Sequence, residues 1–277
     1  MPALRQTAAS GFAALSVDEL TIDDEASFRH VALYAELKQV LRAATYRFRV
    51  LPSAPGGQWE RALLLNLVFW QADAGGDVLA DRHLPADVVA HAAWHHLASR
   101  AVSGNDAPAS AGAMLLGEAI ASAFDLYLIG RLLGQAPQSS FLQTQVPAMA
   151  EAAMAAGLPD TEFERLLASV ACEPELAFSD LRELLSDVTS ALFACDSAEA
   201  ALGALARFET HRFASLLHHY ELSNWILHAR AHGHPSALAD ARVEAVDFAM
   251  RSAPVALDWL VAQWVLPAQQ CAQPSAH

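Results

Sequence analysis

The chain has 277 residues, of which 54% are hydrophobic and 17% are charged. This composition is typical of a compact globular protein and excludes a disordered chain, and the length suffices for one large domain or two small ones. The net charge of −14 argues against a nucleic-acid partner, because phosphate binding relies on clustered Lys and Arg.

We expect no membrane span and a cytoplasmic location. The apolar run Ala62–Trp70 is too short to cross a bilayer, and Ala253–Pro267 contains Asp258. The N-terminus lacks the apolar stretch of a secretory signal. The three cysteines, an odd and widely spaced set, fit reduced thiols better than disulfides; they are Cys172, Cys195 and Cys271.

The first third of the chain mixes helix and strand signals. Residues 23–44 read as a helix with an apolar stripe that includes Leu37 and Leu41. Residues 45–51 then alternate, with Phe48 and Val50 on one face and the neighbouring arginines on the other, which predicts a half-buried strand. Ala62–Trp70 reads as a buried strand, with a buried helix as the alternative, and residues 78–80 as a short edge strand.

From Pro85 onward nearly every segment predicts a helix. One helix should run over residues 85–102, a second from Ala113 to Leu133, and a series of helices should follow to Leu266. The predicted fold class is therefore α+β and predominantly α, with a small N-terminal sheet packed on the helix 85–102. We expect an α/β part at residues 1–134 and a helical part at residues 135–277, or one continuous domain.

The helix 85–102 carries His91 and His95, which the helical period places one turn apart on the same face. Two imidazoles at this spacing can bind one metal ion from the same side. Glu118 lies in the next, very apolar helix, with Ser122 and Asp125 on its face. A buried carboxylate is costly unless it is paired or metal-bound. The sequence thus predicts a single-ion site formed by His91, His95 and Glu118.

This arrangement resembles the gluzincin branch of the zincin metalloproteins. In that family a short sheet precedes a His-Glu-x-x-His helix, and a glutamate on the following helix completes the zinc site. The residues that match are His91, His95 and Glu118, and the likeness covers residues 46–131, about a third of the chain. The resemblance implies a zincin-like scaffold with a metal ion at these three residues.

Two departures from the family pattern bear on the chemistry. The position of the family's general-base glutamate is Ala92, and alanine cannot accept a proton from metal-bound water. The family's supporting acid, one turn after the metal-binding glutamate, is Ser122, so that Asp125 would support the ligands only from the next turn. Two histidines and one carboxylate are also the ligand set of non-haem iron enzymes, which need no such base.

A second histidine-rich stretch, residues 209–234, is predicted to form one helix. Within it, His218 or Tyr220 could donate a hydrogen bond to a developing oxyanion, a role that the resemblance implies for a downstream His or Tyr. The stretch could instead hold a second metal ion or form a solvated helix face. The residues expected on its continuous face are His211, His218, Glu221, Trp225, His228 and His232.

Three functional hypotheses follow. The first is an enzyme that acts on a small molecule with one Fe(II) or Zn(II) ion, in which iron-dependent oxidation is favoured over peptide hydrolysis. The second is an all-helical dinuclear iron oxygenase that also uses Asp125, His218 and Glu221. The third is a zinc hydrolase-like protein or a catalytically inactive, metal-free binding protein. The sequence does not indicate an oligomeric state.

Overall fold

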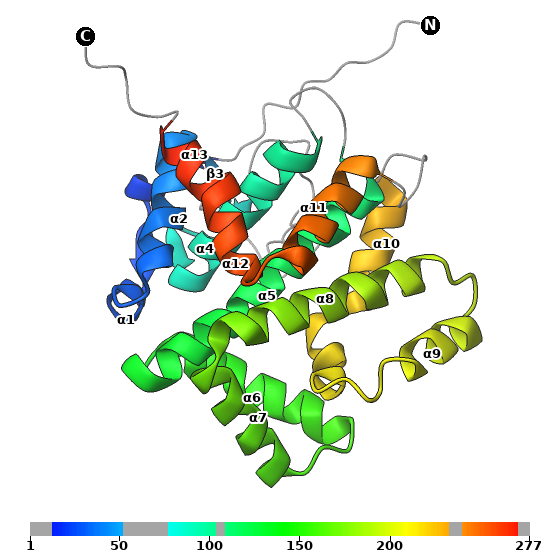
Figure 1. The fold of residues 1–277 in the computed structure, drawn as a ribbon. Helices are drawn as coiled ribbons and strands as arrows, with labels where there is room; N and C mark the ends of the chain where they lie inside the picture. The colour runs from blue at the N-terminus through cyan, green and yellow to red at the C-terminus, as the bar shows by residue number, and fades with distance from the viewer. Residues whose placement is uncertain (1–12, 52–76, 104–108, 233–239, 271–277) are drawn as a thin grey trace, which may run out of the picture.

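The computed structural model describes residues 13–51, 77–103, 109–232 and 240–270. Two short sheets form near the N-terminus, and helices make up the rest (Figure 1). The expected fold class, α+β and predominantly α, is therefore confirmed. The helices are α1 (Glu25–Phe28), α2 (Ala32–Ala43), α4 (Ala86–Ala98), α5 (Ala111–Gln135), α6 (Ser140–Ala155), α7 (Asp160–Cys172), α8 (Pro174–Phe193), α9 (Ala198–Ala206), α10 (Leu222–His232), α11 (Ala241–Ser252), α12 (Ala256–Leu260) and α13 (Leu266–Gln270).

The first sheet has the strand order β1-β3-β4. β3 (Phe48–Val50) pairs antiparallel with β1 (Ala13–Leu15) and parallel with β4 (Val78–Leu79). Phe48 and Val50 are buried as their alternation predicts, and β4 is the expected edge strand. The predicted strand Ala62–Trp70 lies outside the described residues.

The second sheet joins β2 (Thr21–Asp23) to β5 (His83–Pro85) in parallel, directly before α4. The helix expected over residues 23–44 is interrupted here, which corrects that prediction. α1 ends at Phe28, and Val31 adopts an extended conformation before α2 begins. The interruption lets Phe28 and Val31 both enter the core, where they are 0% and 3% exposed.

α5 is the central helix of the protein. It packs against α4, α7, α8 and α10, and most of its residues are buried (Figure 1). By length and composition alone α5 could cross a membrane, so our expectation that no segment has these properties was wrong for Ala111–Gln135. However, 89% of its most apolar 18-residue window is buried inside the protein, as in the core helix of a globular protein.

The last described helix packs against a helix from the N-terminal part of the chain. α13 lies beside α2 (Figure 1). The side-chain amide of Gln269 donates a hydrogen bond of 3.2 Å to the carbonyl oxygen of Glu36. Four further short helical segments lie among the described residues. Two are the 3₁₀ helices Val17–Glu19, between β1 and β2, and Ala214–Tyr220, before α10. The other two are π-helical turns: Ser99–Ser103 extends α4, and Val261–Val265 links α12 to α13.

Gly130 allows α5 to approach the junction of α7 and α8. A Cβ atom at this position would lie 2.5 Å from the carbonyl oxygen of Val170 and 2.9 Å from the Cβ of Pro174. We expect Gly130→Ala to lower the free energy of unfolding by about 1–3 kcal/mol, because backbone atoms must move to relieve the overlap. Urea unfolding can measure the loss. Gly134→Ala is the control, since a Cβ there meets nothing within 4 Å, and an equal effect of both changes would contradict the packing argument.

Candidate metal centre

α4 presents the two histidines. It begins after Pro85, whose fixed φ suits a helix start, and Asp87 lies in the first turn, where a carboxylate is favourable. His91 and His95 follow on one face, with their rings 4.9 Å apart. The same face packs closely on α5, since a Cβ atom added at Gly117 would lie 3.5 Å from the Cβ of Ala98 and 3.6 Å from Nδ1 of His95.

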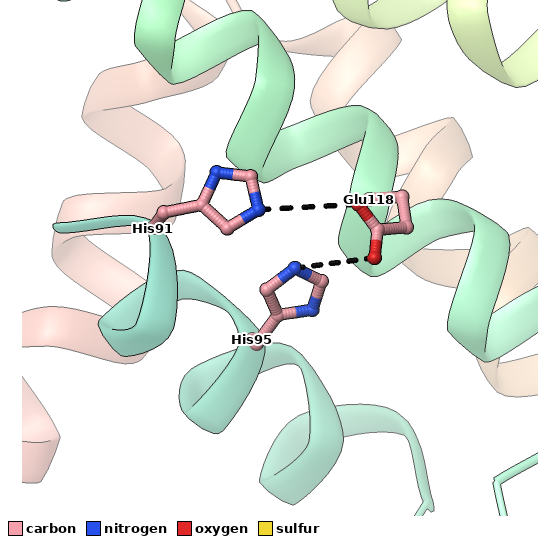
Figure 2. Close-up of side chains that lie close together, drawn as sticks. All are labelled: His91, His95 and Glu118. Carbon is pink, nitrogen blue, oxygen red and sulfur yellow. Dashed lines mark ion pairs between the residues drawn. The ribbon is translucent and has the colours of Figure 1, made fainter. Parts of the chain in front are cut away.

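Glu118 faces these histidines from α5 and is 6% exposed (Figure 2). One carboxylate oxygen lies 3.9 Å from Nε2 of His91, and the other lies 3.4 Å from Nε2 of His95. The three ligand atoms all lie within 4.8 Å of one another. Ligands held about 2.1 Å from one ion can be at most about 4.2 Å apart. Small side-chain rotations would therefore let all three residues bind one ion.

The charges of the three side chains are coupled. Burial lowers the pKa of His91, but Asp125 and Glu118 outweigh this effect and raise the pKa to about 9. Burial raises the pKa of Glu118, but the neighbouring His95 and His91 outweigh it, so that this pKa is lowered. The site thus stabilises an ionised carboxylate, which is the form that binds a cation.

Asp125 supports His91 from behind. Its Oδ2 lies 3.0 Å from Nδ1 of His91. The other ring nitrogen of His91, Nε2, is the one that points at Glu118. In neutral His91, Nδ1–H donates a hydrogen bond to Asp125, and the lone pair of Nε2 can then bind a metal ion that displaces the second ring proton. The other oxygen, Oδ1, is buried without a hydrogen-bond partner. Asp125 thus lies within hydrogen-bond distance of His91, while Ser122 lines the same cavity and does not bond to the histidines.

We expect Asp125→Asn to weaken metal binding about 10- to 100-fold, because an amide accepts the Nδ1 proton less strongly and no longer fixes the ring. Competition with a metal-sensitive dye would measure the affinity. Ser122→Ala is the matched control one turn earlier on α5 and should leave the affinity unchanged. Equal affinities for the wild type and Asp125→Asn would show that Asp125 does not support a ligand.

A cavity of about 310 Å³ opens next to the triad. His91, Glu118 and Asp125 lie on one side of it. Five of the eleven other lining residues are apolar, and apolar walls strengthen electrostatic interactions by lowering the local polarity. The apolar residues are Val88, Leu126, Ile129, Met149 and Trp225.

The histidine-rich stretch does not form one continuous helix, which corrects that prediction. Ala214–Tyr220 is a 3₁₀ helix, Glu221 has a left-handed backbone with φ of 47°, and α10 begins at Leu222. The change of direction turns His219 and Tyr220 toward the cavity, whereas His218 is exposed and lines a separate groove. The structure thus brings Tyr220, but not His218, to the metal centre.

Two titratable residues that line the cavity, Asp87 and His219, were not predicted from the sequence as site residues. Asp87 lies one turn before His91, and burial together with the charge of Asp125 raises its pKa to about 7. His219 also lines the cavity, and its pKa is lowered by burial. The i, i+4 spacing of Asp87 and His91 could have indicated from the sequence that Asp87 lies on the same helix face as His91. The position of His219 depends on the 3₁₀ helix, which the sequence did not predict.

The other residues of the histidine helix take structural roles. Ala92, at the family's general-base position, is 2% exposed and does not line the cavity. His96 points away from Glu118, and its ring centroid lies 5.6 Å from that of Tyr46.

The cysteines Cys172 and Cys195 are free thiols, and Cys271 lies outside the described residues.

Comparison with known proteins does not assign the chain to a family. No protein-family profile matches it, and neither a curated protein sequence nor a solved structure gives a significant match. The zincin resemblance therefore stands on the residues alone. The function has to be argued from the His91, His95 and Glu118 group, the one candidate metal-ligand set among the residues that the structure describes.

Proposed function

We propose that the protein is an enzyme that uses one Fe(II) or Zn(II) ion, held by His91, His95 and Glu118, to transform a small molecule. The observation that carries this proposal is the buried carboxylate of Glu118, which directs both oxygens at imidazole nitrogens of a neighbouring helix. The bond from Asp125 to His91 supports it, since metal-binding histidines usually donate their other ring proton to a carboxylate or carbonyl group.

Within this function, oxidation by non-haem iron is favoured over hydrolysis. Hydrolysis on a zincin scaffold needs a carboxylate next to the first histidine, and Ala92 occupies that position in the core. Two histidines and one carboxylate are the ligands of non-haem iron enzymes, in which a bound ion would supply the redox chemistry. Proton transfer, hydrogen bonding to the substrate and exclusion of water would be carried out by the residues that line the cavity.

Two of these residues, Asp87 and Tyr220, have chemistry suited to a reaction. Asp87 can take up and release a proton near neutral pH, because its pKa is raised to about 7 by burial and by Asp125. Tyr220 keeps its proton, since burial and Asp125 raise its pKa, and can donate a hydrogen bond to an oxygen atom in the cavity. Apolar side chains such as Trp225 and Met149 exclude water from the reacting group.

The test begins with the metal. Protein loaded anaerobically with Fe(II) and desalted should contain one iron per chain by mass spectrometry, and His91→Ala should contain none. Two irons per chain would favour the dinuclear hypothesis. No uptake of Fe(II) or Zn(II) would leave a metal-free protein in which the triad is an imidazolium–carboxylate pair.

A second measurement separates oxidation from hydrolysis. Zinc-loaded protein should hydrolyse p-nitrophenyl acetate no faster than His91→Ala, because no base is placed to activate water. Iron-loaded protein should consume dioxygen faster than zinc-loaded protein in an oxygen electrode. Zinc-dependent ester hydrolysis that His91→Ala abolishes, without iron-dependent oxygen uptake, would replace our proposal with a hydrolase.

A further inference from the structure

A second and larger cavity, the α9–α10 groove, opens beside the metal centre. It has a volume of about 1280 Å³ and is bounded by the turn between α6 and α7, the C-terminal end of α8, α9, Ala214–Tyr220 and α10. Its lining is largely aliphatic. The principal apolar side chains are Leu158, Leu202, Leu205, Leu222, Ile226 and Leu227.

Two of these leucines are unusually exposed for large aliphatic side chains. Leu202 on α9 is 69% exposed and Leu227 on α10 is 63% exposed. Exposed apolar area costs about 25 cal/mol per Å², so covering both side chains with an apolar molecule is favourable. An aliphatic occupant of the groove would provide that cover.

The groove adjoins the metal cavity. His218 lines the groove, His219 and Tyr220 line the metal cavity, and Glu221 lines both. The segment from His218 to Glu221 therefore lies between the two spaces, and they share a boundary at Glu221.

The charges around the groove exclude one class of occupant. Four carboxylates line it, namely those of Glu162, Asp196, Glu209 and Glu221. Both arginines of the lining have partners inside the protein: Arg212 forms an ion pair with Asp180 at 2.7 Å, and Nη2 of Arg230 donates to the carbonyl oxygen of Phe193 at 2.8 Å. An anionic head group would therefore meet four carboxylates and only two arginines, each of which already interacts with the protein.

We propose that the α9–α10 groove binds an aliphatic molecule that carries no negative charge, and that this molecule is the substrate of the metal centre. The assignment of this molecule as the substrate rests on the function proposed above. The aliphatic part lies against Leu202 and Leu227, and the end to be transformed passes Glu221 and enters the cavity of His91 and Glu118.

The first test measures binding without any metal. Dodecan-1-ol and dodecanoate would compete with the uncharged fluorescent probe Nile red. Dodecan-1-ol should displace the probe, and dodecanoate should bind at least ten times more weakly. The double variant Leu202→Gln and Leu227→Gln should bind dodecan-1-ol at least ten times more weakly than the wild type. Both leucines are exposed, so the variant should keep its circular dichroism spectrum and its unfolding temperature.

Phe248→Gln is the matched control, because Phe248 is 73% exposed on α11 and does not line the groove. It should bind dodecan-1-ol like the wild type. Equal binding of dodecan-1-ol and dodecanoate, or equal loss in Phe248→Gln and the double variant, would overturn the proposed groove. So would the failure of dodecan-1-ol to displace the probe.

The second test connects the groove with the metal centre. In protein loaded with Co(II), dodecan-1-ol should change the visible absorption of the ion, at concentrations that match its displacement of Nile red. Binding of the alcohol without a spectral change would overturn its assignment as a substrate. If the chain takes up no Co(II), Fe(II) or Zn(II) yet binds dodecan-1-ol, the proposed metal function fails and the substrate assignment with it, while the preference of the groove stands.

Discussion

Glu118→Ala should release the metal ion and leave the fold intact. The two remaining ligands, His91 and His95, project from one helix and cannot enclose an ion, so we expect the affinity to fall by more than about 100-fold. The fold should survive because alanine suits both a helix interior and the apolar surroundings of α5. Isothermal titration with Zn(II) measures the first effect, and circular dichroism measures the second.

Two controls make this result specific. His96→Ala removes an imidazole from the same helix, but from a side chain that contacts Tyr46 instead of Glu118. It should retain the affinity of the wild type. Glu118→Gln retains one oxygen ligand without its charge and should fall between the wild type and Glu118→Ala. Full metal binding by Glu118→Ala would remove the basis of the proposed function.

Arg182→Ala should destabilise the protein by about 3–5 kcal/mol. Arg182 on α8 is 0% exposed, and its guanidinium bonds to Asp247 on α11 and, at 3.2 Å, to Glu183. Alanine would leave these two carboxylates without their buried counter-charge and would also leave a void in the core. Urea unfolding measures the change in free energy.

Arg251→Ala is the appropriate comparison. Arg251 pairs with Asp247 and Asp187 in the same network, but its side chain is 31% exposed, so we expect a loss of about 1 kcal/mol or less. Arg182→Met should be milder than Arg182→Ala, because it keeps most of the buried volume. If Arg182→Ala and Arg251→Ala lower the free energy of unfolding equally, burial does not determine how much Arg182 contributes to stability.

The regular helices and strands could be predicted from the sequence because the patterns that mark them are local. The alternation of Phe48 and Val50 marked β3, and Pro85 marked the start of α4. The pairing of strands was less accessible. β2 and β5 are three residues each and pair through a register of distant residues, Thr21 with His83, which no local pattern encodes. The interruption between Phe28 and Val31 likewise depends on the core into which both side chains pack.

The metal-centre residues were predictable to a similar extent. His91 and His95 follow from helical spacing, and Glu118 follows from the cost of a lone carboxylate in an apolar helix. The second histidine stretch misled us because its spacing fits a continuous helix, whereas Glu221 takes a left-handed backbone. That conformation costs about 1–2 kcal/mol for a residue other than glycine and must be offset by packing around it. Spacing alone could not distinguish His218 from His219.

The burial of α5 has a consequence for the newly made chain. At a synthesis rate of about 5–20 residues per second, α8 is complete several seconds after α5 has left the ribosome. Until then α5 lacks the helix that covers much of its surface, and by length and composition it matches a membrane-crossing segment. During this interval we expect the nascent chain to expose apolar surface of α5, of the kind that chaperones bind. Timely completion of α8 should therefore favour correct folding.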